Sequence, residues 1–167
     1  MLGGQAQEEG DLLDENIIVE RLGPSRASDL AHALAVLVQA AESALAVSSP
    51  ASKNHLAQAL GMPNCYVFLA TDADGPVGYA SAYRFPRLDA VGDQVYLFDI
   101  EVASFARQRG VGRSLLEGLL ATCWAEGVQW AWAGTARENI PAQRLFAAAG
   151  GLPAGETYIE YHFTPDK

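Results

Sequence analysis

The sequence predicts an α/β fold, in which one mixed β-sheet carries helices on both of its faces. The chain of 167 residues has the length of one domain and can bury a sizeable core. Half of the residues are hydrophobic and 19% are charged, a balance typical of a folded globular protein. Strand-like and amphipathic helical segments follow one another in the order β-α-α-β-β-β-α-β-α-β, without an internal repeat or a linker. A single mixed sheet is the economical packing of that order.

Residues 1–16 are glycine-rich and acidic and show little hydrophobic periodicity. We therefore expect a mobile leader before a single domain over residues 17–167. The domain begins with a short strand at Ile17–Val19. Pro24 and Ser25 then open a helix. Its apolar face comprises Leu30, Leu34, Leu37, Val38, Ala41 and Leu45.

A shorter helix is expected around Ser52–Leu60, and the run Gly61-Met62-Pro63 ends it. Two strands follow, Cys65–Thr71 and Val77–Phe85. Asp72-Ala73-Asp74-Gly75 lies between them and is a strong turn signal, so the two strands are predicted to form a hairpin.

The next strand, Gln94–Val102, carries two carboxylates near its end. Side chains alternate between the two faces of a strand. Strict alternation predicts that Val95, Leu97, Asp99 and Glu101 share one face and that Tyr96, Phe98, Ile100 and Val102 share the other. Asp99 and Glu101 are therefore expected to point the same way.

The second half of the chain continues with a helix from Gly110 to about Glu126, a strand at Val128–Ala133 and a helix from Asn139. The first of these helices is expected to bury Val111, Leu115, Leu116, Leu119 and Leu120, and the second Ala142, Leu145, Phe146 and Ala149. Gly150-Gly151 ends the last helix, and Thr157–Phe163 is expected to form a terminal strand.

Net charge limits the classes of partner. The chain carries a formal charge of −9 and has a pI of about 4.6, which argues against nucleic acid or an anionic membrane. An acidic protein favours a cationic substrate. No long apolar stretch and no basic, apolar leader occurs, so we expect a cytoplasmic protein.

The cysteines, histidines and tryptophans often belong to functional sites, but here their sequence contexts favour roles in packing or on the surface. Cys65 and Cys123 lie in apolar segments and are expected to be buried thiols in a reducing compartment. The histidines lack the spacing of metal ligands, so no metal site is predicted; they are His32, His55 and His162. The tryptophans are expected in the core or at an interface, since no basic patch accompanies them; they are Trp124, Trp130 and Trp132.

A basic, glycine-rich turn connects the acidic strand to the helix that follows. Its pattern is Arg107-x-x-Gly110-x-Gly112. Such a turn leaves the first amides of the helix free, with the positive end of the helix dipole behind them. It predicts a pyrophosphate-sized anion site and a cofactor with a diphosphate and a long tail. The fingerprints of dinucleotide-binding and P-loop proteins are both absent.

This turn, together with Asn139-x-x-Ala142-x-x-x-Phe146 in the last helix, resembles the GCN5-related N-acetyltransferase (GNAT) superfamily over roughly residues 17–163. Within it the chain is most similar to the aminoglycoside 3-N-acetyltransferases of this fold. The matching stretches are Phe85-Pro86-Arg87, Tyr96 to Val102, the Arg107 to Gly112 turn and His162-Phe163.

The resemblance implies acetyl-coenzyme A as cofactor and direct attack by an amine. The residues implied in pyrophosphate binding are Arg107, Gln108, Arg109, Gly110, Val111, Gly112 and Arg113. The strand edge at Ile100–Val102 would pair with the pantetheine amides, and the amide at Val102 would face the thioester oxygen as an oxyanion hole. The last helix would contribute Asn139, Ala142 and Phe146, although Asn139 is equally explained as a helix cap.

Asp99 and Glu101 are the candidates for catalysis and for binding a cationic amine. Asp99 is the expected base, because the aminoglycoside enzymes carry an aspartate at its position, whereas Glu101 lies where they commonly have a small residue. The alternative for both is a solvated strand face. Tyr79 and Tyr83 share a strand face with Ser81 and either line the acceptor cleft or pack in the core.

Phe146 departs from the family, which often has a tyrosine there whose phenol protonates the leaving thiolate. The expected function is acetyl transfer to a small polycationic amine, with an aminoglycoside as the first candidate. Acetylation of a protein amino terminus, a lysine or a polyamine is the second candidate, and a non-catalytic coenzyme A-binding module is the third. A homodimer is left open.

Overall fold

The computed structural model describes residues 16–40 and 51–154, and all statements below concern those residues. At its centre lies a five-stranded sheet with the order β1-β2-β3-β4-β5. The strands are β1 (Ile18–Arg21), β2 (Cys65–Asp72), β3 (Gly75–Pro86), β4 (Asp93–Val102) and β5 (Trp130–Ala133). Neighbours from β1 to β4 are antiparallel, and β5 is parallel to β4. The predicted mixed sheet is confirmed.

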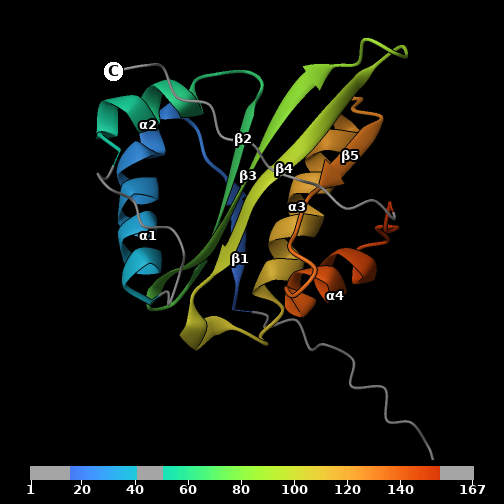
Figure 1. Ribbon diagram of the computed structural model, residues 1–167. Coiled ribbons are helices and arrows are strands. Elements are labelled where there is room, and N and C mark those ends of the chain that lie inside the picture. The colour runs from blue at the N-terminus through green and yellow to red at the C-terminus, as the bar shows by residue number, and fades with distance from the viewer. Residues whose placement is uncertain (1–15, 41–50, 155–167) are drawn as a thin grey trace, which may run out of the picture.

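Helices cover both faces of this sheet, as predicted. They are α1 (Ala27–Ala40), α2 (Lys53–Leu60), α3 (Val111–Ala125) and α4 (Ile140–Ala148), with short 3-10 helices at Pro24–Arg26 and Ser104–Ala106. Figure 1 shows α1 and α2 on one side of the sheet and α3 and α4 on the other. Helix α1 packs against β3 and α2 against β2, while α3 crosses β1 to β4. We call the two sides the α1 face and the α3 face.

The predicted elements are found with small changes at their ends. The fifth strand is predicted over Val128–Ala133 but begins only at Trp130. Val128 is buried but lies before the strand. Three expectations lie outside the described residues: almost all of the leader over 1–16, the positions Ala41 and Leu45 on the apolar face of the first helix, and the terminal strand Thr157–Phe163. No described helix is long and apolar enough to cross a membrane.

The α3 face holds much of the core. Helix α3 buries Val111, Leu115, Leu116, Leu119 and Cys123. Cys65 is also buried, so both cysteines are buried free thiols, as predicted. Helix α4 and its C-cap pack Leu145, Phe146 and Ala149 against this core, and Ala142 is half-buried on the same side, where it lines a pocket. The predicted inward positions of α4 are therefore confirmed.

The prediction of strict alternation along β4 is wrong, because the strand contains a β-bulge. Ser81 of β3 lies opposite Asp99, but the next residue, Ala82, lies opposite Leu97. Phe98 has no opposite residue on β3. One extra residue in β4 therefore shifts the pleat at this point.

The bulge decides which face the carboxylates occupy. Directly opposed residues of two paired strands point to the same face. Leu97, opposite Ala82, lies on the α3 face with Val95, and both are buried. Asp99 and Glu101 follow Ser81 and Tyr79 onto the α1 face. The two carboxylates thus share a face as predicted, but not the face of Val95 and Leu97.

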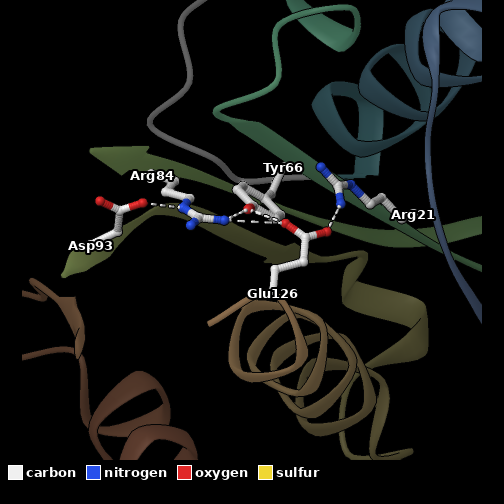
Figure 2. Close-up of polar contacts among 5 residues, drawn as sticks. All are labelled: Arg21, Tyr66, Arg84, Asp93 and Glu126. Carbon is white, nitrogen blue, oxygen red and sulfur yellow. Dashed lines mark hydrogen bonds and ion pairs between the residues drawn. The ribbon is translucent and has the colours of Figure 1, made fainter. Parts of the chain in front are cut away.

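A cluster of paired charges lies at the C-terminal end of α3, next to the start of β4 and away from Asp99 and Glu101 (Figure 2). Glu126 accepts hydrogen bonds from Arg21 Nη1 at 2.6 Å and from the Tyr66 hydroxyl at 2.5 Å. Arg84 donates from Nε to Asp93 at 2.7 Å, and its Nη1 lies 3.6 Å from Glu126. The guanidinium of Arg21 also lies over the Tyr66 ring, 4.2 Å from its centre. We call these five residues the charge cluster; its two cations match its two anions.

Candidate functional site

Strands β4 and β5 separate where the bulge begins. Their parallel pairing runs from Gln94 opposite Trp130 to Leu97 opposite Ala133 and ends there. Strand β4 continues to Val102 and remains paired with β3. In the described part of the chain, the other edge of β4 beyond Leu97 meets no further strand. A bulge bends its strand and increases the local twist, which accounts for the separation at this point.

A pocket of about 170 Å³ lies in this opening. Its lining residues are Leu97, Phe98, Asp99, Ile100, Glu101, Gly134, Thr135, Asn139, Ala142 and Phe146. The structure thus brings the acidic end of β4 together with the start of α4. Six of the sequence-predicted site residues meet here, three from each element: Asp99, Ile100, Glu101, Asn139, Ala142 and Phe146.

Asp99 is a carboxylate with a perturbed pKa at this pocket. Burial raises the pKa of Asp99, and a hydrogen bond from the Tyr79 hydroxyl to Asp99 Oδ2 at 3.3 Å lowers it in part. The pKa of Tyr79 is itself raised, chiefly by burial and then by the charges of Asp99 and Glu101. A carboxylate with a raised pKa is a stronger base than an ordinary one.

The two predicted acceptor-side tyrosines differ in burial. Tyr79 is buried and lies opposite Glu101, whereas Tyr83 is 39% exposed and lies opposite Tyr96. Both stand on the α1 face with Ser81, as the sequence predicts. We call Asp99 and Glu101 the acid pair. Tyr79 therefore contacts this pair from the neighbouring strand β3, whereas Tyr83 is a surface residue beside it.

The glycine turn has a left-handed backbone at two positions. Gln108 has a φ of 61° and Gly110 a φ of 77°. Gly110 is the N-cap of α3, and its carbonyl accepts from the Ser114 amide at 2.9 Å. The amides of Val111 and Gly112 precede the first intrahelical donor, so the helix itself offers them no acceptor. This geometry suits the predicted anion site.

The arginine side chains of the turn are held by neighbouring groups. Arg109 pairs with Asp72 at 3.0 Å, and Arg113 with Glu117 at 2.8 Å. Arg107 donates from Nε to the carbonyl of Val102 at 3.4 Å. These contacts tie the turn to the β2–β3 hairpin and to the end of β4. The backbone is thus the part of the turn best arranged for an anion.

Two other predicted residues have clear structural roles. Gly112 faces Leu145 and Val102, and a Cβ there would lie 3.4 Å and 3.6 Å from their side chains, which is ordinary contact, so this position packs α3 against α4 and β4 without strictly requiring glycine. Asn139 is the N-cap of α4, and its side chain accepts from the Ala142 amide at 3.2 Å. The capping interpretation of Asn139 is confirmed, and the residue also lines the pocket.

Sequence reasoning missed four residues of the lining: Leu97, Phe98, Gly134 and Thr135. Thr135 brings a hydroxyl group from the loop after β5. That loop, Gly134–Glu138, has no periodic pattern, so only the position after a strand end could have pointed to it. Phe98 could have been found only by predicting the bulge.

One family model matches most of the chain. The model of the Acetyltransferase (GNAT) family matches residues 34–150. A search among curated proteins finds no significant match.

Solved structures with the same fold share little sequence with the chain. One is an aminoglycoside acetyltransferase from an uncultured soil metagenomic sample in complex with sisomicin, with a TM-score of 0.79 and 20% identity, covering 92% of this chain and 99% of that one. Another is the aminoglycoside N-acetyltransferase AAC(6')-Iy in complex with CoA, with a TM-score of 0.67 and 20% identity over 88% and 94% of the chains. A third is a ribosomal-protein-alanine N-acetyltransferase from Brucella melitensis biovar Abortus 2308, with a TM-score of 0.66 and 15% identity over 88% and 99%.

Proposed function

The chain belongs to the acetyltransferase (GNAT) family. We propose that it transfers the acetyl group of acetyl-coenzyme A to an amine of a small polycationic acceptor. An aminoglycoside is the first candidate, and its 3-N amine is the expected position. One observation carries the proposal: the pocket in which a half-buried carboxylate with a raised pKa meets an open strand edge and the start of α4.

The chain's own groups fit coenzyme A. The left-handed Gly110 and the first amides of α3 suit a pyrophosphate, and the open edge of β4 from Ile100 to Val102 suits an extended chain with amide groups. Phe146 and Ala142 offer apolar contact from α4. When bound, the coenzyme supplies the activated acetyl thioester.

In this proposal the acid pair serves the acceptor. Asp99 accepts a proton from an ammonium group of the acceptor, which frees the amine lone pair for attack, and the raised pKa of Asp99 brings its basicity closer to neutral pH. Glu101, on the same face, holds a second ammonium group of the acceptor. The backbone amide at Val102 stabilises the developing oxyanion, a contribution of about 3 kcal/mol in comparable enzymes. Phe146 has no proton to donate to the leaving sulfur, so this position supplies no general acid.

The relatives support the choice of acceptor. Two of the three structures described above are named as aminoglycoside acetyltransferases, one in complex with sisomicin. The third is named for the acetylation of an alanine of ribosomal protein. The chain's charge of −9 adds a general attraction for a polycation.

A panel of amines tests the proposal. The purified protein is incubated with acetyl-coenzyme A and kanamycin, spermidine or a peptide with an amino-terminal alanine, and released thiol and product mass are measured. We expect kanamycin to be the fastest acceptor. Fastest turnover of the peptide would assign the chain to amino-terminal acetylation. Tight calorimetric binding of acetyl-coenzyme A without thiol release for any amine would identify a non-catalytic binding module.

A further inference from the structure

Four aromatic side chains form a continuous row across β3, β4 and β5 on the α1 face. They are Tyr83, Phe98, Tyr96 and Trp132. The ring centres of Tyr83 and Phe98 are 5.8 Å apart, those of Phe98 and Tyr96 6.1 Å, and those of Tyr96 and Trp132 4.3 Å. We call this row the aromatic strip.

The strip is open to solvent. Phe98 is 60% exposed and Trp132 42% exposed, so Trp132 lies outside the core, and of the two places expected for it only an interface remains. Among the described helices, α1 packs against β3 and α2 against β2, so the cover on this face stops short of β4 and β5 (Figure 1). Tyr83 is exposed as well, and Tyr96 is half-buried between its neighbours. A contiguous group of exposed apolar rings marks a binding surface more often than scattered residues do.

The strip is continuous with the acid pair. Phe98 is the bulged residue of β4, and it lines the same pocket as Asp99 and Glu101. Bulges near active sites commonly re-aim a side chain. Here the extra residue places an exposed ring between the two carboxylates and the rest of the strip. A ligand held by the carboxylates would therefore lie beside the rings.

The molecule already places a cation on a ring at the edge of this surface. The guanidinium of Arg87 lies over the ring of Trp130, 5.0 Å from its centre. Trp130 precedes Trp132 on β5 and is opposite Gln94, as Trp132 is opposite Tyr96, so both tryptophans are on the α1 face. The faces of aromatic rings attract cations and also pack against apolar C–H groups.

We propose that the aromatic strip is the subsite for the rings of the acceptor: a polycationic amine built on saturated rings, whose C–H faces lie on Phe98 and Trp132 while its ammonium groups reach Asp99 and Glu101. This inference rests on the proposed function and narrows the acceptor to amines that carry saturated rings. A linear polyamine has the charges but lacks ring faces, so the strip would discriminate between the two kinds of acceptor.

Alanine variants of two strip residues test this subsite. Phe98→Ala and Trp132→Ala should each raise the KM for kanamycin about five- to thirtyfold, with kcat changed less than about threefold, because ring contacts bind the acceptor before and during the reaction. The KM for spermidine should change less than about twofold. Trp124→Ala is the matched control, since Trp124 is a similarly exposed tryptophan on α3, away from the strip. It should leave both KM values unchanged.

Calorimetric titration with kanamycin separates this inference from the proposed function. Kanamycin binding that weakens in Phe98→Ala and Trp132→Ala supports the subsite even if no acetyl transfer occurs. Failure of the parent protein to bind kanamycin overturns the subsite, while thiol release with a peptide or spermidine would still support acetyl transfer. Equal KM and affinity in the parent and both variants also overturns it.

Two further outcomes would assign the strip to another occupant. Conversion of a dimer to a monomer in both variants at unchanged KM, measured by sedimentation, would show that a second copy covers the strip. A large fall in melting temperature at unchanged KM would show that the strip packs within the chain. Either outcome overturns the proposal.

Discussion

Asp99 lies on the α1 face near the end of β4 and Glu126 lies at the end of α3 on the other face, and their surroundings act on their pKa values in opposite directions. Glu126 lies in the charge cluster, where hydrogen bonds from Tyr66 and Arg21 lower its pKa despite some burial (Figure 2). Asp99 forms no ion pair within the described part of the chain; burial raises its pKa, and the hydrogen bond from the Tyr79 phenol offsets part of the rise. The fold thus stabilises the charge of one carboxylate and disfavours the charge of the other.

The difference separates a structural carboxylate from a chemical one. In the charge cluster each carboxylate has an arginine, so protonation would break good contacts. At the pocket Asp99 is half-buried, and no cation of the described residues contributes to its pKa. A cationic acceptor would supply that missing charge. The following variants test this contrast, in order of their expected effect on turnover.

Asp99→Asn should have the largest effect. We expect kcat to fall by roughly tenfold to a thousandfold, because the amide cannot accept the acceptor's proton. The affinity for acetyl-coenzyme A should change less than about twofold in calorimetry, since the lost charge faces the acceptor. Asp89→Asn, on the exposed β3–β4 connection, is the matched control and should turn over normally. Parent-like turnover in Asp99→Asn would remove Asp99 from the mechanism.

Phe146→Tyr should change kcat by less than about tenfold. A thiol with a pKa of about 8.5 can leave near neutral pH with little help from an acid. The new hydroxyl must also find a hydrogen-bond partner near Ala142 and Leu145, which are apolar. Turnover of both proteins across pH at saturating cofactor is the measurement. A hundredfold gain would instead indicate that the natural chain lacks an acid it needs and is mainly a cofactor-binding relative.

Tyr79→Phe should leave kcat on the pH plateau within about threefold and move the acidic limb of kcat/KM to higher pH. The hydrogen bond from Tyr79 lowers the pKa of Asp99, so its loss raises that pKa. Asp99 must be ionised to accept a proton, and activity is therefore lost at a higher pH as the pH falls. Glu101 and Tyr83 also lie near this carboxylate on the same face.

Tyr83→Phe is the comparison for that shift, because it removes a hydroxyl from the same strand face and keeps the ring. Its acidic limb should coincide with that of the parent protein. Equal shifts in the two variants would show that Tyr79 acts through general polarity and not through its hydrogen bond to Asp99.

Glu126→Gln should leave turnover unchanged and lower stability by about 1–2 kcal/mol at pH 7, because two arginines lose a charged partner that is partly exposed. The pKa of Glu126 is lowered in the folded state, so its charge contributes stability above the ordinary glutamate pKa. That contribution is lost as the pH falls through the lowered value. Urea unfolding should therefore show parent and variant converging towards pH 3; a constant difference would contradict the role of the charge.

The helical half of the site was predictable because its information is local. The spacing of Ala142, Leu145, Phe146 and Ala149 alone identifies the inward side of α4, and the left-handed turn at Gly110 follows from its glycine. The β4 half was predictable only in part. Local alternation cannot reveal a bulge, because the extra residue is set by the register with β3.

The charge cluster depends on distant partners in the same way. Arg21 and Glu126 are 105 residues apart, and Tyr66 and Glu126 are 60 apart. No local pattern relates them, so their meeting depends on the packing of α3 across four strands. The exposed Trp132 was assigned to the core or an interface for a similar reason, since exposure depends on where the helices on its face end.

The bulge at Phe98 also affects how residue roles pass between related chains. If Phe98 is left out, the residues before and after it alternate without interruption: Leu97 lies on the α3 face, Asp99 on the α1 face and Ile100 on the α3 face. Phe98 is thus an insertion in the pleat that leaves its neighbours' faces unchanged. An ungapped alignment to a strand without this extra residue would place every role beyond it one position off and turn the acid pair towards α3. When residue roles are transferred by homology along β4, the alignment needs a one-residue gap opposite Phe98.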